Sequence, residues 1–185
     1  MDTGDDSYRR YLGGDDEGLT ALVELYKDGL ILYLNGYVKN IHLAEELAEE
    51  TFFRLITKKP HFAGRSSFKS FLYAIGRNIA MDYLRRNART AETPIEEVAH
   101  LLREEQELEQ AYLQEERKRT LHRALGALSP AYRSILWLVY IEGFSNREAS
   151  AALKMTDRQV RNLLYRAKQA LRTKLEKEGI TNEDF

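Results

Sequence analysis

Apolar residues recur along this chain at helical spacing, and no segment alternates as a β-strand does. A first amphipathic helix is predicted over Asp16–Val38, although Gly29 and Gly36 within it favour a break or bend. A second helix is predicted over 43–58, where apolar residues follow i, i+3, i+4 spacing. The pattern therefore predicts an all-α fold.

A third helix is expected after a loop at 59–66, which Pro60 and Gly64 punctuate. Ser67 has the side chain of a good N-cap, and the helix is predicted to run to about residue 87. We place these helices in a first domain at 1–88. The stripe expected to be buried is Phe68, Leu72, Ile75, Ile79 and Tyr83.

The charge is unevenly distributed, although the formal net charge is only −1. Nine basic residues against one acidic residue lie at 54–89, and eight against two lie at 143–175. Between them, 92–116 carries nine glutamates and one arginine. Basic blocks of this kind are typical of contacts with nucleic-acid backbones, although two solvated helix faces would give the same pattern. We therefore predict an acidic linker at 89–115 and a second domain at 116–178.

Helix signals continue through the second domain. One helix is predicted over 116–127. Ser129 and Pro130 are a typical N-cap and first position of the next helix, which Gly143 is expected to end. The last residues, 179–185, are expected to form a tail.

A helix-turn-helix is predicted next. Ser145 and Glu148 have the spacing of a capping box, and the short helix they begin is rich in small side chains. Lys154 stands in the following turn where such turns usually have glycine, and a left-handed conformation there would cost lysine roughly 1 kcal/mol. Thr156 is expected to cap a second helix over 157–171.

One face of that second helix is polar and suited to reading DNA. Arginine, asparagine and glutamine can make paired hydrogen bonds to base edges in the major groove. An ordinary basic surface helix could carry the same side chains, but the capping box, the tight turn and the second cap together favour DNA binding. The face comprises Arg158, Arg161, Asn162, Tyr165, Arg166 and Gln169.

Residues 128–133 and 143–174 resemble the C-terminal domain of bacterial sigma factors, and the best match is the extracytoplasmic-function group of the sigma-70 family. The segment AEELAEETF at 44–52 resembles the core-polymerase-binding helix of that family. The segment FAGRSSFKSFLYAIGRNIAMDYLRR at 62–86 resembles its promoter-melting segment. Both sets of motifs occur in the family's order.

The resemblance implies roles for individual residues. Phe62 and its neighbours would capture a flipped base of the −10 element, with a core plug beneath the loop as the alternative for Phe62. Lys69, Tyr73 and Arg77 are expected on one exposed face. The −10 set is Phe62, Ala63, Arg65, Ser66, Lys69, Tyr73, Arg77 and Asn78. The −35 set is Arg158, Gln159, Arg161, Asn162, Tyr165 and Arg166, with Arg133 and Arg147 on the flanking backbone. The polymerase-binding set is Glu46, Leu47, Glu49 and Glu50.

The resemblance also implies partners. We expect core RNA polymerase, through its clamp and flap, and promoter DNA. Relatives are commonly held inactive by an anti-sigma factor that is often membrane-bound. We therefore also expect an anti-sigma partner and a cytoplasmic bacterial location, with sequestration at the membrane through that partner.

Other classes of function are less favoured by the residues. There is no cysteine, the four histidines are scattered, and no phosphate loop or metal-ligand spacing occurs, so we expect no enzyme, small-molecule substrate, metal or cofactor. The longest apolar run, 135–141, is too short to cross a bilayer. An autonomous helix-turn-helix regulator and a helical protein-interaction module remain as alternatives. The first leaves 62–86 unexplained, and the second leaves the polar helix face unexplained.

Overall fold

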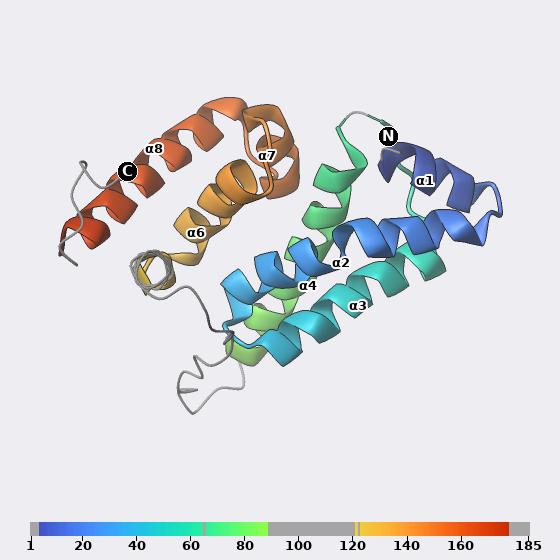
Figure 1. Ribbon diagram of the computed structural model, residues 1–185, viewed down its shortest axis with the longest axis horizontal. Helices are drawn as coiled ribbons and strands as arrows, with labels where there is room; N and C mark the ends of the chain where they lie inside the picture. The colour runs from blue at the N-terminus through green and yellow to red at the C-terminus, as the bar shows by residue number, and fades with distance from the viewer. Residues whose placement is uncertain (1–3, 65, 89–120, 122, 178–185) are drawn as a thin grey trace, which may run out of the picture.

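The computed structural model describes residues 4–64, 66–88, 121 and 123–177. All elements in these ranges are helices, so the all-α prediction is confirmed (Figure 1). The predicted linker, the predicted tail and Arg65 lie outside the described residues. The first bundle comprises α1 Gly4–Leu12, α2 Asp16–Val38, α3 Ile41–Lys58 and α4 Phe68–Ala88. The second comprises α6 Pro130–Leu136, the π-helical turn η1 Trp137–Ile141, α7 Asn146–Leu153 and α8 Asp157–Lys177.

Helix α2 is continuous, so of the break or bend expected at its glycines, the break is wrong. A Cβ atom on Gly29 would lie 2.7 Å from the hydroxyl of Tyr73, and one on Gly36 would lie 3.5 Å from Cδ of Arg133. Gly29 therefore lets α4 approach the helix closely, and this packing outweighs the poor helix propensity of glycine, whereas 3.5 Å at Gly36 is an ordinary van der Waals contact.

Helix α1 was not predicted, because its sequence begins with polar and acidic residues. Tyr8 is nevertheless fully buried, and its hydroxyl donates to the carbonyl of Pro60 at 2.8 Å. Burial, followed by the neighbouring Tyr11, raises the pKa of Tyr8 to about 12. The carboxylate of Asp5 accepts a hydrogen bond from the backbone N–H of Phe68 at 2.7 Å. Helix α1 therefore closes the first bundle and satisfies a free amide at the start of α4.

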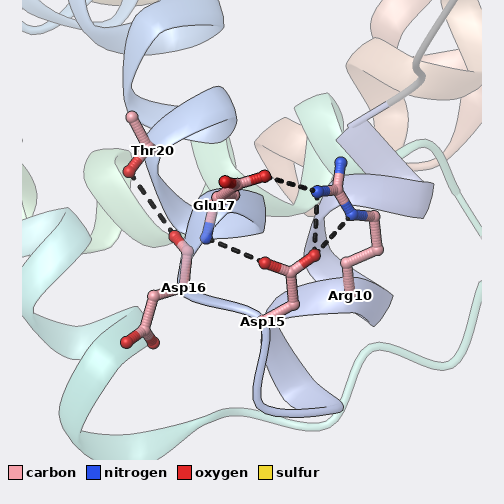
Figure 2. A network of polar contacts seen from close by, with 5 residues as sticks. All are labelled: Arg10, Asp15, Asp16, Glu17 and Thr20. Atoms are coloured by element: carbon pink, nitrogen blue, oxygen red, sulfur yellow. Dashed lines mark hydrogen bonds and ion pairs between the residues drawn. The ribbon is translucent and has the colours of Figure 1, made fainter.

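A polar network fixes the turn between α1 and α2 (Figure 2). Asp15 caps α2, and its carboxylate accepts from the N–H of Glu17 at 3.0 Å and from Nε of Arg10 at 2.8 Å. The guanidinium of Arg10 also lies 3.5 Å from the carboxylate of Glu17. This turn sets the antiparallel packing of α1 on α2.

The second bundle follows the predicted order. Ser129 caps α6, and Pro130 is its first residue. The helix then continues as the wider π-helical turn η1, in which the N–H of Glu142 donates to the carbonyl of Trp137 at 3.0 Å. Gly143 ends the segment with φ of 70°, as predicted, whereas the widened turn was not expected.

The two bundles pack against each other, α6 against α2 and α7 against α4 (Figure 1). The ring of Tyr73 in α4 lies 5.5 Å from that of Phe144, which is buried at the start of the helix-turn-helix. The described residues therefore form one continuous core that spans both bundles.

Candidate DNA-binding surfaces

The helix-turn-helix begins with the predicted capping box. Oγ of Ser145 accepts from the N–H of Glu148 at 3.3 Å, and Oε2 of Glu148 accepts from the N–H of Ser145 at 2.9 Å. Lys154 ends α7 in the left-handed region with φ of 54°, as expected for that turn. The local sequence therefore dictates both ends of α7.

A second reciprocal cap begins α8. The N–H of Thr156 donates to Oε1 of Gln159 at 2.8 Å, and the N–H of Gln159 donates to Oγ1 of Thr156 at 3.3 Å. Thr156 was predicted as the cap, but the part played by Gln159 was missed, although the three-residue spacing is its sequence signal. In addition, Oγ of Ser150 donates to Asp157 at 2.6 Å and ties α7 to α8. The side-chain oxygen of Gln159 is thus engaged in the cap, which leaves its NH₂ group to donate hydrogen bonds to DNA.

Helix α8 separates a buried face from an exposed one. Val160 and Ala167 are fully buried, and Leu164 and Leu171 pack against the same core. The predicted reading face is exposed on the other side, with Tyr165 66% exposed. No ion pair neutralises its arginines within the described part of the chain. The exposed side chains are Arg158, Gln159, Arg161, Asn162, Tyr165 and Arg166.

The two arginines predicted to flank this face differ. Arg147 is exposed near the start of α7, beside a cleft that also reaches Ser66 and Ser67 of the first bundle. Arg133 is half-buried, and burial lowers its pKa. Its guanidinium donates to four carbonyls, of Gly36, Leu125, Gly126 and Leu128. Arg133 therefore joins the bundles in this conformation, and four of its five N–H donors are engaged.

The loop before α4 carries Phe62 in an aromatic cluster. Its ring lies 5.4 Å from that of Phe71, 5.9 Å from Phe68 and 6.4 Å from Tyr8. Phe62 is half-buried there, which agrees with the alternative that its ring fills the core beneath the loop. Ala63 is exposed, and Ser66 is half-buried.

The prediction that Lys69, Tyr73 and Arg77 share an exposed face is wrong for this conformation. Tyr73 is 0% exposed, and Lys69 and Arg77 are half-buried, as is Asn78 one position further on. Nε of Arg77 is buried and has no hydrogen-bond partner among the described residues. Two elements cover this side of α4: α2, whose Tyr33 ring lies 5.1 Å from that of Tyr73, and the second bundle. Neither packing could be placed from local sequence patterns.

The polymerase-binding set lies on α3. Glu46 and Glu49 are exposed, and Glu50 is half-buried in an ion pair of 3.0 Å with Arg54. Leu47 is 7% exposed and packs in the core, so it supports the helix from inside. Phe53 was not predicted as part of this set. It is 58% exposed and lies four residues after Glu49, on the same face.

Within the described part of the chain, no three His, Cys, Asp or Glu side chains are grouped so that they could hold a metal ion. None of the described helices is long and apolar enough to cross a membrane.

Comparisons with known proteins agree with this architecture. Residues 22–90 match the family model for Sigma-70 region 2, and residues 118–171 match that for Sigma-70, region 4. The chain is 27% identical to the ECF RNA polymerase sigma factor SigX of Bacillus subtilis over 165 residues, which is 87% of this chain and 85% of that protein. It is 32% identical to the ECF RNA polymerase sigma factor SigE of Mycolicibacterium smegmatis over 139 residues, which is 75% of this chain and 54% of that protein.

Two solved structures share the fold. One is the sigma factor RpoE in complex with the anti-sigma factor NepR from Bartonella quintana, with a TM-score of 0.70, 22% identity, and coverage of 85% of this chain and 96% of that one. The other is CnrH in complex with the cytosolic domain of CnrY, with a TM-score of 0.66, 20% identity, and coverage of 92% and 95%.

The two family models match in the order that defines a small sigma factor, and together they span more than half of the chain. The chain belongs to the sigma-70 family, in its extracytoplasmic-function group. Members of this family bind core RNA polymerase and promoter DNA, so the chain is a transcription initiation factor that directs the polymerase to promoters.

Proposed function

We propose that α8 reads the −35 element in the major groove and that α4, with the loop before it, binds and opens the −10 element. The observation that carries the first assignment is the division of α8 into two faces. One face is buried and apolar, and the other exposes Asn162, Tyr165 and arginines that form no ion pair with any described residue. The short α7 and its tight turn give the geometry in which the second helix of such a motif enters the groove.

The −10 assignment rests on side chains of α4 that are covered in this conformation and must be uncovered before DNA can reach them. Lys69 and Arg77 supply positive charge for phosphates, and Tyr73 supplies an aromatic ring for stacking on an unpaired base. The aromatic cluster around Phe62 is the apolar setting that an extruded base needs. Engagement of Phe62 itself requires its ring to leave that cluster.

Core polymerase binding is assigned to the outer face of α3. Glu46 and Glu49 provide exposed negative charge there, and Phe53 provides exposed apolar surface next to them. An apolar anchor rimmed by charges is the usual composition of a protein interface. The chain then acts as a specificity subunit without catalytic activity of its own.

We also infer control by an anti-sigma factor. One similar solved structure is a complex of a sigma factor with an anti-sigma factor, and the match covers 85% of this chain. The partner would hold the chain in the cytoplasm, or at the membrane where the partner itself is anchored.

The assignment is tested by adding the full chain to core RNA polymerase with a library of promoter sequences. We expect polymerase binding and specific initiation at a subset defined by two spaced elements. Tight, specific binding of the free chain to duplex DNA, without polymerase binding, would instead identify an autonomous regulator.

A further inference from the structure

Helix α1 contacts both ends of the loop between α3 and α4, residues 59–67 (Figure 1). The hydroxyl of Tyr8 donates to the carbonyl of Pro60 at 2.8 Å, near the start of this loop. Oδ1 of Asp5 accepts from the N–H of Phe68 at 2.7 Å, directly after its end. Residues three apart lie on one side of a helix, so one side of α1 holds the loop at two points.

The ring of Tyr8 also forms one wall of the aromatic cluster that contains Phe62. Tyr8 is fully buried, and its ring lies 4.8 Å from that of Phe68 and 6.4 Å from that of Phe62. Phe62 is only half-buried, so its ring lies at the edge of the cluster toward solvent. The ring of Phe62 can therefore leave the cluster to admit a base while Tyr8 and Phe68 stay in place.

Helix α1 is itself fixed against α2. A Cβ on Gly18 of α2 would lie 2.7 Å from the backbone N of Tyr11. A Cβ on Gly4 of α1 would lie 2.7 Å from the ring of Tyr26. Glycine at these positions lets the two helices pack in close contact, and the network around Arg10 holds the turn between them (Figure 2). Helix α1 is thus a fixed support from which two hydrogen bonds act on the loop.

Helix α1 lies outside both ranges that the family models match, 22–90 and 118–171, so family membership assigns it no role. We propose that α1 is a brace for −10 recognition, in which Asp5 and Tyr8 are positioning residues that hold the ends of the loop in place for base capture. This role rests on the proposed function, because it requires the loop to bind the −10 element. A loop that is already ordered loses less conformational entropy on binding, so the brace strengthens capture.

Two substitutions each remove one point of support. Tyr8→Phe deletes the hydroxyl that binds Pro60 and keeps the buried ring. Asp5→Ala deletes the acceptor for the N–H of Phe68, whereas Asp5→Asn keeps an acceptor oxygen at that position. The brace therefore predicts that the first two variants are impaired and that Asp5→Asn is not.

Two matched controls lie on the same helix. Tyr11→Phe removes a hydroxyl that bonds to the carbonyl of Ile56 in α3 at 3.5 Å, outside the loop. Asp6→Ala removes an exposed carboxylate that pairs with Arg9 within α1. The controls make the same chemical changes but leave both hydrogen bonds to the loop in place.

The order of the loop is measured in the full chain with one nitroxide label. Because the chain lacks cysteine, the label can be attached at Ala63→Cys, an exposed position of the loop. Tyr8→Phe and Asp5→Ala should both increase the mobility of the label in the electron paramagnetic resonance spectrum. Asp5→Asn and the two controls should leave it unchanged. Native mobility in both Tyr8→Phe and Asp5→Ala would overturn the proposal.

The effect on promoter opening is measured with holoenzyme at a promoter selected from the library. The rate of open-complex formation at increasing holoenzyme concentration separates initial promoter binding from opening. Tyr8→Phe and Asp5→Ala should each lower the maximal opening rate about threefold to tenfold, the usual effect of one lost hydrogen bond, with initial binding unchanged. Asp5→Asn and the controls should retain the native rate. A native maximal rate in both impaired variants would overturn the proposal.

Thermal unfolding and affinity for core polymerase are measured on each variant. If Asp5→Ala does not fold, Tyr8→Phe decides the outcome, because it keeps the buried ring. If Tyr8→Phe does not fold or loses polymerase affinity, its hydroxyl serves the fold rather than the loop, and the proposal is overturned. The proposed function fails separately, if initiation by native holoenzyme does not depend on the −10 sequence.

Discussion

The hydroxyl of Tyr37 donates to Oγ of Ser134 at 2.6 Å, across the contact between the two bundles. Both side chains are buried, and they stand 97 positions apart in the sequence. The hydroxyl of Tyr33 completes the group, at 3.1 Å from each of them. Buried polar groups are favourable only when all of them are satisfied, so this network specifies one docking arrangement of α6 on α2.

Ser134→Ala should weaken the docking by about 1 kcal/mol, because the two tyrosine hydroxyls lose their shared partner but keep each other. The measurement is the free energy of unfolding in denaturant. A double-mutant cycle with Tyr37→Phe should give a clearly non-additive effect. Additive effects would show that the two hydroxyls do not interact in solution.

Lys154→Gly should stabilise the chain by about 1 kcal/mol, because glycine adopts the left-handed conformation at this turn without a steric penalty. Thermal unfolding reports the change. Gln169→Gly, at an exposed position inside α8, is the control and should destabilise by about 1 kcal/mol. A loss of stability in Lys154→Gly would mean that its side chain makes an important contact.

The capping carboxylate of Glu148 should make stability depend on pH. Burial raises its pKa, but hydrogen bonds from Ser145 and Ser67 and the charge of Lys69 outweigh this and lower the pKa below its ordinary 4.5. A folded-state pKa below the unfolded one gives a contribution that is present above about pH 4.5 and is lost as the pH falls through the folded-state value.

The expected result for Glu148→Gln is therefore a stability difference from the native chain that shrinks as the pH falls below about 4.5. Denaturant unfolding at a series of pH values measures it. A difference that stays constant over the acidic range would rule out the capping carboxylate as its source.

Phe53→Ala should weaken binding to core polymerase while leaving the fold intact, since the ring is mostly exposed on the outer face of α3. Its neighbour Phe52 gives the contrast. That ring is 7% exposed, so Phe52→Ala should cost about 3–5 kcal/mol of stability. Affinity for core polymerase and thermal unfolding are measured on both variants. If Phe53→Ala binds core polymerase as tightly as the native chain does, the polymerase-binding surface does not include this face of α3.

Local chemistry was sufficient to predict the helix-turn-helix. Ser145 with Glu148, Thr156 and the left-handed Lys154 are each decided within a few residues, and each was found as expected. The α8 stripe likewise follows from helical periodicity alone.

Long-range packing could not be predicted in the same way. Gly29 and Gly36 were expected to break or bend α2, but the helix is continuous, and Gly29 is a point of close approach for Tyr73 of α4. Tyr73 has the spacing of an exposed residue, yet a distant segment covers it. Helix α1 was missed because its polar start outweighs the single fully buried ring of Tyr8. In each case the deciding partner lies far away in the sequence.

The central claim is that α8 reads the −35 element while α4 and the loop before it bind the −10 element. Its most direct test is run-off transcription by holoenzyme that carries alanine at Arg161, Asn162, Tyr165 and Arg166. These side chains are exposed, so the variant should fold and bind core polymerase as the native chain does. The account predicts that discrimination between promoters with intact and scrambled −35 elements is lost. Native discrimination by this holoenzyme would contradict the account.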